Sequence, residues 1–356
     1  MKIWLRRIHL YLALLSGLFL LILSISGAIL LYANDIQYYI QPDKWQVVPQ
    51  TKTLSHAELI RAVQQQTDKK ITRFMPLSNP NASWQFRLGD GSNASVNPYT
   101  GKVIFQYQTN DTLYGFTLAL HRWLLFETAS GEKPLKNVVS VCALLLIINV
   151  LVGFYLWVKP KNRLKRLAIK PKAKFKVLMY QLHTVLGVYV LLPLLLIAFT
   201  GITFNWKSAT KTLVETVAFS QVRNRPKAPT VIANSTASTN YDQAINKALD
   251  VFPEGILYRI YLPKKHNDPI ALRIQNPGES HAYSWVWVNP YSAKVLSAYD
   301  ASKANAVTHI WNFKYVFHTG AFAGPIVKFV WLLVSLSLAF FILSGVYLWC
   351  KRHKWV

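Results

Sequence analysis

Residues 138–158 read VVSVCALLLIINVLVGFYLWV and contain no charged side chain. An α-helix rises about 1.5 Å per residue, so about 20 residues cross a hydrocarbon layer that is about 30 Å thick. Three other charge-free stretches are at least as long, namely residues 10–32, 177–206 and 329–350. The sequence therefore predicts four transmembrane helices. The third stretch has 30 residues, too many for a simple span, and we expect it to project from the bilayer or to bend at Pro193.

The composition of the chain excludes several classes of protein. Of its 356 residues 52% are apolar and 15% are charged, and the formal net charge is +25. Disordered chains are poor in large apolar residues, and the long apolar blocks argue against an ordinary soluble enzyme. The basic residues flank the apolar blocks instead of forming a nucleic-acid patch, so we expect a membrane and no nucleic acid as partner. Two cysteines are too few for a disulfide framework, a zinc ribbon or a CxxCH haem attachment site.

Basic residues predict the orientation of the spans. Fifteen of the 40 Lys and Arg residues, and none of the 15 acidic residues, lie at the two termini and in the loop 159–176. Cytoplasmic flanks collect Lys and Arg, so we predict that both termini and this loop are cytoplasmic. Segments 33–137 and 207–328 then face outward. The first apolar region has 23 residues and is too long for a cleaved signal peptide.

The chain contains an internal repeat. Residues 96–103 read VNPYTGKV and residues 288–295 read VNPYSAKV, and the second and fourth spans end in GFYLW at 153–157 and GVYLW at 345–349. Both comparisons give an offset of 192 residues. Each repeat holds a span, an outward segment and a second span, so both copies enter the membrane in the same sense. We predict a membrane α-helical fold, a four-helix transmembrane bundle built from two parallel repeats.

Each outward segment has the pattern of a small α+β domain. Helices are expected over residues 57–66 and 241–251, and residues 221–240 have the composition of a polar linker. Strands are expected over residues 71–75, 84–88, 102–107, 257–262, 270–275, 284–288 and 294–298. The predicted division of the chain is a first helix (1–32), a first outward domain (33–120), a histidine segment with the second helix (121–158), a basic loop (159–176), a third helix (177–206), a second outward domain (207–308), a histidine segment with the fourth helix (309–350) and a tail (351–356).

Four histidines occupy repeat-related positions near the two membrane edges. His9 and His183 begin the first and third spans at the cytoplasmic edge, and His121 and His318 precede the second and fourth spans outside. The repeat predicts that the two members of each pair face one another across the bundle. Two neutral imidazoles on opposite faces of an iron atom are the axial ligands of a haem that transfers electrons. We therefore predict an inner haem between His9 and His183 and an outer haem between His121 and His318.

Four glycines support the prediction of two haem sites, one at an inner and one at an outer level of the bundle. Gly27 and Gly201 each follow a span-opening histidine by 18 residues, or five helical turns, and so lie on the same helix face about 27 Å further out. Gly153 and Gly345 lie near the inner ends of the second and fourth spans. Each level would hold two histidines and two glycines, and a glycine lets a flat macrocycle approach the helix backbone. The alternative is that these glycines are ordinary helix-packing notches.

Other assignments of these residues stay open. A single histidine at a membrane edge is commonly an interfacial hydrogen-bonding residue and not a ligand. A zinc or copper site is a second alternative, but it would need further ligands at each level. His309 is the reserve outer ligand and His353 the reserve inner ligand. Candidates for pairing with haem propionates, or alternatively interface anchors, are Arg6, Arg7, Arg122 and Lys314.

The sequence shows no convincing Gly-rich dinucleotide loop, Walker sequence or Ser/His/Asp arrangement. We therefore expect electrons to come from a membrane quinol or an electron-donor protein, and not from a nicotinamide bound to this chain.

In their order along the chain, the motifs resemble those of the PepSY-associated transmembrane family of bacterial inner-membrane proteins. The matching residues are Arg6-x-x-His9, LHRW at 120–123, LH at 182–183, His-x-Gly at 318–320, VNPYTGKV at 96–103 and the two G-x-YLW span ends. The likeness covers nearly the whole chain. It implies a haem b protein of the inner membrane with two PepSY-like periplasmic domains, and some members, the ferrioxamine-type siderophore reductases, reduce ferric siderophores in the periplasm. One departure is Ser292-Ala293 in the second turn, where the first copy has Thr100-Gly101.

Two functions follow as expectations. The first is a diheme b-type reductase that passes electrons across the membrane to a periplasmic ferric siderophore or similar ferric chelate and so releases Fe(II). The second is a non-enzymatic, membrane-anchored PepSY binding or regulatory module accessory to metal or siderophore uptake. A transporter is a weaker third interpretation, because the spans lack ionisable residues at mid-depth. Residues that would contact a bulky chelate, or are alternatively core residues, are Trp45, Trp84, Trp285, Trp287 and Trp311.

Overall fold

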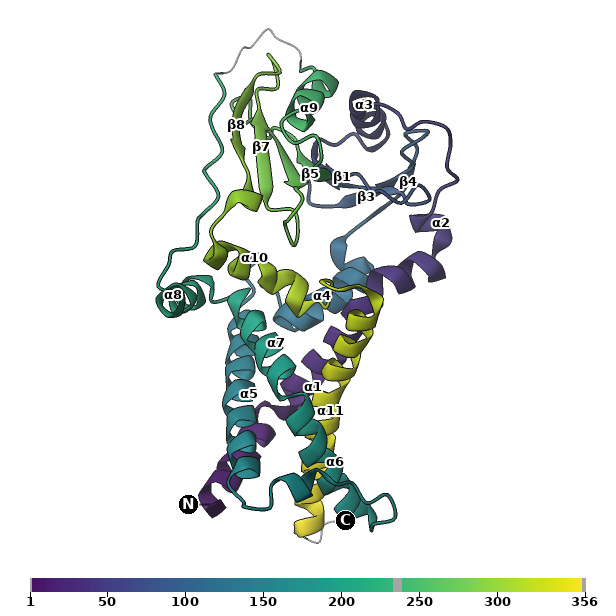
Figure 1. The fold of residues 1–356 in the computed structure, drawn as a ribbon. Helices are drawn as coiled ribbons and strands as arrows, with labels where there is room; N and C mark the ends of the chain where they lie inside the picture. The colour runs from purple at the N-terminus through teal and green to yellow at the C-terminus, as the bar shows by residue number, and fades with distance from the viewer. Residues whose placement is uncertain (1, 233–238, 354–356) are drawn as a thin grey trace. The chain divides into compact units, whose positions relative to one another are not determined.

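A computed structural model describes residues 2–232 and 239–353 of the protein. The chain divides into two compact units (Figure 1). The helical unit comprises the chain up to Ala33, Phe116–Val214 and the chain from Lys314 onward. The sheet unit comprises Asn34–Gly115 and Glu215–Phe313. Of the predicted linker 221–240, residues 233–238 lie outside the described part of the chain.

All four apolar stretches are helical, as predicted. They lie in α1 (Lys2–Ile40), α5 (Leu135–Val158), α11 (Gly324–Arg352) and the pair α6 (Phe175–Tyr189) and α7 (Leu191–Thr203). Among the described residues, three helices are long and apolar enough to cross a membrane, and the pair α6–α7 makes a fourth if it counts as one span.

The third stretch bends by 66° between α6 and α7, which is one of the two alternatives expected for it. The break falls at Val190, three residues before Pro193. Proline has no N–H for the carbonyl four residues earlier and its ring clashes with that carbonyl, so the helix opens one turn upstream of the proline.

The four helical stretches share one buried apolar cluster. Each contributes two residues to it: Leu20 and Leu23 from α1, Cys142 and Leu146 from α5, Leu194 and Ala198 from α7, and Val334 and Leu338 from α11. Ser24 and Ser335 tie α1 to α11, because each hydroxyl donates to the other residue's carbonyl. Such small polar contacts are typical of helices that pack within a membrane.

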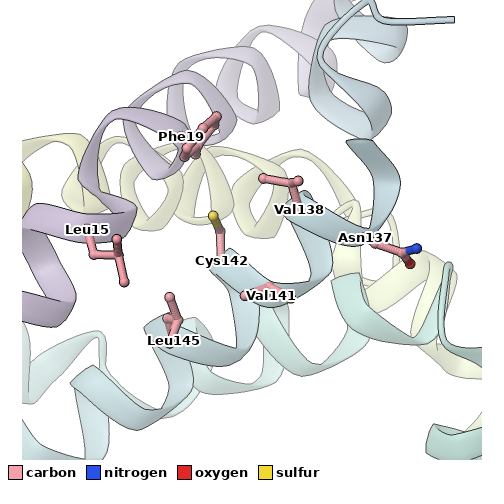
Figure 2. A pocket seen from close by; sticks show the side chains of 7 residues that line it. All are labelled: Leu15, Phe19, Asn137, Val138, Val141, Cys142 and Leu145. Atoms are coloured by element: carbon pink, nitrogen blue, oxygen red, sulfur yellow. The ribbon is translucent and has the colours of Figure 1, made fainter. Parts of the chain in front are cut away.

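An apolar pocket opens between α1 and α5 (Figure 2). Its lining includes Leu15 and Phe19 of α1 and Val138, Cys142 and Leu145 of α5. Cys142 and Cys350 are both free thiols.

Three helices that lie next to the membrane-spanning stretches in the sequence were not predicted. They are α4 (Leu113–Trp123), α8 (Lys207–Ala218) and α10 (Ala306–His318). His121 and His318 therefore lie at the ends of separate helices and not at the start of the spans that follow. After α4 the backbone turns through Leu124 and Leu125, both with positive φ, and after α10 it turns at Gly320, where φ is +64°.

The described residues of the sheet unit form eight antiparallel strands in one sheet. The strands are β1 (Ile71–Met75), β2 (Trp84–Leu88), β3 (Asn93–Val96), β4 (Val103–Tyr107), β5 (Ile256–Tyr261), β6 (Ile270–Gln275), β7 (Ser284–Val288) and β8 (Val295–Tyr299). Their order in the sheet is β4-β3-β2-β1-β5-β6-β7-β8. All seven predicted strands are present, and the short β3 was missed because its sequence, NASV, has little apolar pattern.

The expectation of two separate outward domains is wrong. Strand β1 of the first copy pairs with β5 of the second, and both halves contribute to a single core beneath α3 (His56–Thr67) and α9 (Tyr241–Leu249) (Figure 1). Each half alone would leave an edge strand with unpaired backbone groups, and joining β1 to β5 removes both edges. Among the described residues, four short elements complete the fold outside the sheet: α2 (Pro42–Trp45) and the 3-10 turns Thr109–Asp111, Leu164–Leu167 and Ala301–Lys303.

The two repeat-related turns have the same backbone conformation despite their different sequences. In the first turn, Gly101 has φ of +71° and the Asn97 side chain accepts from the backbone N–H of Tyr99. In the second, Ala293 has φ of +56° and Asn289 accepts from Tyr291. The asparagine, not the glycine, is thus the shared feature of the two turns.

Candidate functional site

The structure brings each predicted histidine pair together within the helical unit. His9 on α1 and His183 on α6 have ring centroids 6.4 Å apart, with ring planes at 78°. His121 at the end of α4 and His318 at the end of α10 have centroids 6.2 Å apart, with ring planes at 58°. All four side chains are half-buried, and each pair takes one histidine from each repeat.

The spacing of the rings fits two imidazoles on opposite faces of one metal ion. An imidazole nitrogen binds a transition metal such as zinc at about 2.0–2.1 Å, and the ring centre lies about 1 Å beyond the nitrogen, so two trans imidazoles have centroids about 6 Å apart. Both pairs have this separation. The residues present therefore fit axial ligation of a haem iron.

Hydrogen bonds to Nδ1 hold all four rings. His121 is bonded to the hydroxyl of Ser26 at 3.0 Å, His183 to that of Ser344 at 2.8 Å, and His318 to that of Thr200 at 3.0 Å. His318 also reaches the carbonyl of Ile197 at 3.1 Å, and His9 reaches the carbonyl of Asn149 at 3.1 Å.

The direction of these hydrogen bonds follows from the acceptor to which each hydroxyl donates its single hydrogen. Ser26, Thr200 and Ser344 each donate to the carbonyl four residues earlier in their own helix, at 2.6, 2.8 and 2.6 Å. Each hydroxyl oxygen can therefore only accept from the imidazole, as the carbonyl of Asn149 must. The proton of all four histidines is then on Nδ1, and the lone pair of Nε2 is left for a metal.

Each of these acceptor groups comes from the same repeat as its histidine. The three hydroxyl residues directly precede glycines, giving Ser26-Gly27, Thr200-Gly201 and Ser344-Gly345. In the fourth place, before Gly153, stands Val152, and here the carbonyl of Asn149 replaces the hydroxyl. These hydroxyl residues were not predicted, although the recurrence of a hydroxyl residue directly before a glycine is a signal that could have found them.

The four predicted glycines lie directly against the imidazole rings. A methyl carbon built on Gly27 would lie 3.1 Å from Cε1 of His121, and one on Gly153 would lie 3.1 Å from Cε1 of His9. The corresponding distances are 3.3 Å from Gly201 to His318 and 3.9 Å from Gly345 to His183. The glycines thus leave room for the histidine rings, in addition to any role beside a macrocycle.

The basic residues predicted near the sites lie at or near the surface. Arg6, Arg7 and Arg122 are exposed, with Arg7 over the ring of Trp4 at 6.0 Å and Arg122 over that of Trp123 at 5.8 Å. Lys314, one helical turn before His318, is half-buried, and burial, with the nearby charge of Lys207, lowers its pKa to about 7. A half-buried cation of this kind gains from an anionic partner such as a propionate.

The reserve ligands occupy other surroundings. His309 lines a pocket of the sheet unit with Gly278, Ser280, Ile310 and Phe313. His353, exposed at the end of α11, is bonded through Nδ1 to the carbonyl of Trp349 at 3.0 Å.

The donor set at each level suits a macrocycle better than a bare ion. Within residues 2–232 and 239–353, no group of three or more His, Cys, Asp or Glu side chains gathers into a metal site. Zinc takes four ligands in its structural sites and three protein ligands in catalytic ones. Two imidazoles alone complete the coordination of an iron whose other four ligands belong to a porphyrin.

Comparison with known families agrees with the fold and the motifs. The chain matches the family described as the PepSY-associated TM region over residues 6–352. No curated protein matches the chain.

Proposed function

The chain belongs to the PepSY-associated transmembrane family, and we propose that it is a diheme b-type reductase of the bacterial inner membrane that passes electrons to a periplasmic ferric siderophore and releases Fe(II). The observation that carries the proposal is the arrangement of the two histidine pairs. Both have the ring separation of trans ligands, and all four rings have Nδ1 engaged.

The proposed roles of the residues follow from their positions. His9 and His183 would hold the inner haem, and His121 and His318 the outer one. Haem b, when bound, supplies reversible one-electron transfer between the ferric and ferrous states. The groups that accept from Nδ1–H orient each imidazole and make its Nε2 a better electron donor to a metal. The buried apolar cluster of the helical unit keeps water from the space between the two levels.

The four helical stretches and the basic flanks support the membrane topology of the proposal. With both termini and the loop 159–176 in the cytoplasm, His9 and His183 lie toward the cytoplasmic side, where a quinol or a donor protein would deliver electrons. His121 and His318 lie toward the periplasmic side, where a ferric chelate would be reduced.

Haem content measured on purified protein tests the proposal. We expect a Soret band, reduced b-type peaks and two haems per chain, and we expect each of His9→Ala, His121→Ala, His183→Ala and His318→Ala to lose about one haem. His309→Ala and His353→Ala are the matched controls and should keep both haems. Protein that carries none after expression with ample haem, or four ligand variants that all keep two, would favour the non-enzymatic binding module.

The reductase step needs a second measurement. Haem reduced by dithionite, with the excess removed, should be reoxidised by a ferric siderophore while a ferrous chelator traps the released Fe(II). Haem-loaded protein that no ferric chelate reoxidises would contradict the reductase and leave only an electron-transfer or binding role.

A further inference from the structure

Four arginines form a row across the centre of the sheet. Arg73 of β1 lies opposite Arg87 of β2, and Arg259 of β5 lies opposite Arg273 of β6, while β1 and β5 are themselves neighbours. Because side chains alternate along a strand, these arginines point away from the core that buries Phe74, next to Arg73. We call this surface the arginine face, defined by Arg73, Arg87, Arg259 and Arg273.

The positive charge of the arginine face is not compensated by acidic side chains. In the part of the chain that the structure describes, none of the four guanidinium groups forms an ion pair with a carboxylate. Like charges on directly opposite residues of neighbouring strands destabilise a sheet. Two such arginine pairs, one in each half of the sheet, therefore carry a cost, which the contacts of Arg259 and Arg273 with aromatic rings offset only in part.

The hydrogen bonds of these guanidinium groups go to neutral acceptors. Arg87 donates to Asn93 at 3.1 Å and to Thr109 at 2.9 Å, Arg259 donates to the hydroxyl of Tyr261 at 3.3 Å, and Arg273 donates to the carbonyl of Ala282 at 3.0 Å. Nε of Arg259 is buried without a hydrogen-bond partner among the described residues. Each guanidinium has five N–H donors, so many donors remain for a ligand.

Neighbouring titratable groups respond to this positive charge. Burial, and then the charges of Arg259 and Arg87, lower the pKa of Arg73. Burial, and then the charges of Arg273 and Arg259, lower the pKa of His281 to about 4. A histidine with this pKa is neutral at pH 7, so it adds no further repulsion to an already basic surface.

Aromatic rings border the arginine face on the second-copy side. Trp285 stacks on Tyr261, with centroids 5.4 Å apart, and Arg225 lies 4.1 Å over the ring of Trp285. Of the tryptophans considered for contact with a chelate, Trp285 is half-buried at this border, whereas Trp287 and Trp45 are buried, at 1% and 8% exposure. The border offers flat rings to a ligand that has planar groups of its own.

We propose that the arginine face binds an anionic ferric chelate, one whose iron is held by carboxylate or catecholate groups. Guanidinium groups bind carboxylate and similar oxyanions through paired N–H donors, and a cationic chelate would be repelled by four uncompensated charges. The reduction of this ligand rests on the proposed function, but its binding does not require haem.

The test uses gallium(III) complexes, which have the charge and size of ferric complexes but do not undergo the one-electron reduction. Full-length protein in phosphatidylcholine nanodiscs is titrated by calorimetry with a triply anionic gallium tricatecholate and with a gallium trihydroxamate whose ligand carries an ammonium group, so that the complex is cationic. We expect the anionic complex to bind more tightly, with an affinity that falls as salt rises. In the double variant Arg73→Gln/Arg259→Gln its affinity should fall about tenfold or more, whereas Arg73→Lys/Arg259→Lys should lose less.

Arg61→Gln is the matched control, because Arg61 is exposed on α3, which covers the opposite side of the sheet. It should change the affinity less than twofold. If the first double variant fails to fold, judged by thermal melting, Arg87→Gln/Arg273→Gln replaces it. Equal binding of both complexes, or wild-type affinity in the folded double variants, would overturn the proposal. Normal binding by protein that lacks haem or does not reduce the ferric complex would sustain the site and refute the proposed function instead.

Discussion

At the scale of single residues, the acceptor of each Nδ1–H holds a histidine in the orientation that the proposed haem would need. The hydroxyl of Ser344 accepts from His183 at 2.8 Å and has already donated its own hydrogen to Phe340. We expect Ser344→Ala to lower haem affinity at the inner level about 10–100-fold, the usual cost of losing an outer-shell partner. The inner haem's midpoint potential should rise, because the imidazole becomes a poorer donor. Haem retention and an optical redox titration measure both effects.

Val152 provides the control for this prediction. It stands at the repeat-equivalent position, but His9 is already bonded to the carbonyl of Asn149. Val152→Ser should therefore leave the spectrum and the potentials close to those of the wild type, and Ser344→Thr should retain most of the affinity. A Ser344→Ala protein whose inner haem is unchanged in both affinity and potential would show that the hydroxyl does not position His183.

The glycines against the rings give a second prediction at this scale. A methyl group on Gly153 would lie 3.1 Å from Cε1 of His9, closer than ordinary contact, whereas one on Gly345 would lie 3.9 Å from His183. We expect Gly153→Ala to displace His9 and to reduce inner-haem occupancy, and Gly345→Ala to be tolerated. The measurement is the haem-to-protein ratio of the two variants, and equal ratios would contradict this account of the glycines.

At the scale of helices and strands, most elements were predictable because the spacing of their apolar residues indicates a strand or a helix. Residues 84–88 and 270–275 alternate between core and surface and are strands, and residues 138–158 are uncharged, mostly apolar and helical. The helix α10 was not predicted, since its sequence, AVTHIWNFKYVFH, has no unbroken apolar run, and the N-cap residue Asn305, whose side chain accepts from the backbone N–H of Thr308, was overlooked. The bend was expected near Pro193, but only the structure locates the break at Val190.

Long-range pairing was not visible in the sequence. The joining of β1 to β5 depends on which edges meet, and the residues that meet, such as Arg73 and Tyr261, carry no signal of their partners. The histidine pairs were predictable because the repeat relates their positions. The hydroxyl acceptors were missed, because a serine in a membrane helix most often bonds only within its own helix and the recurrence of a hydroxyl residue before three of the four glycines was not used.

The repeat-related turns yield a prediction about stability. Gly101 has φ of +71°, and a methyl group there would lie 2.8 Å from Cβ of Ala62. We expect Gly101→Ala to destabilise the protein by about 2–4 kcal/mol, as the sum of left-handed backbone strain and overpacking.

Ala293 is the natural control for this substitution. It already adopts φ of +56° with a buried side chain, so Ala293→Gly relieves strain but loses a buried methyl group and adds chain entropy. These effects nearly cancel, and we expect the free energy of unfolding of Ala293→Gly to differ from that of the wild type by less than about 1 kcal/mol. Thermal melting in detergent compares the two variants, and a tolerated Gly101→Ala would refute the steric argument.

At the scale of the whole molecule, the two repeats depend on one another. Each histidine is positioned by its own repeat, as His121 is by Ser26 and Gly27, but each pair needs a histidine from both copies. The sheet follows the same rule, because β1 and β5 close each other's edge. A duplicated chain thus completes its two sites and its one sheet only as a full-length molecule.

The orientation of the chain is the remaining prediction at this scale. The loop 159–176 carries nine Lys and Arg residues and no acid, and such loops stay in the cytoplasm. Alkaline phosphatase, which is active only in the periplasm, should therefore be active when fused after Asp111 or Asp268 and inactive when fused after Lys170. A fluorescent protein at the C-terminus, which folds in the cytoplasm, should give the opposite signal. Phosphatase activity after Lys170 would place the basic loop outside, and His9 and His183 would then lie on the side of the ferric chelate instead of the side of the electron donor.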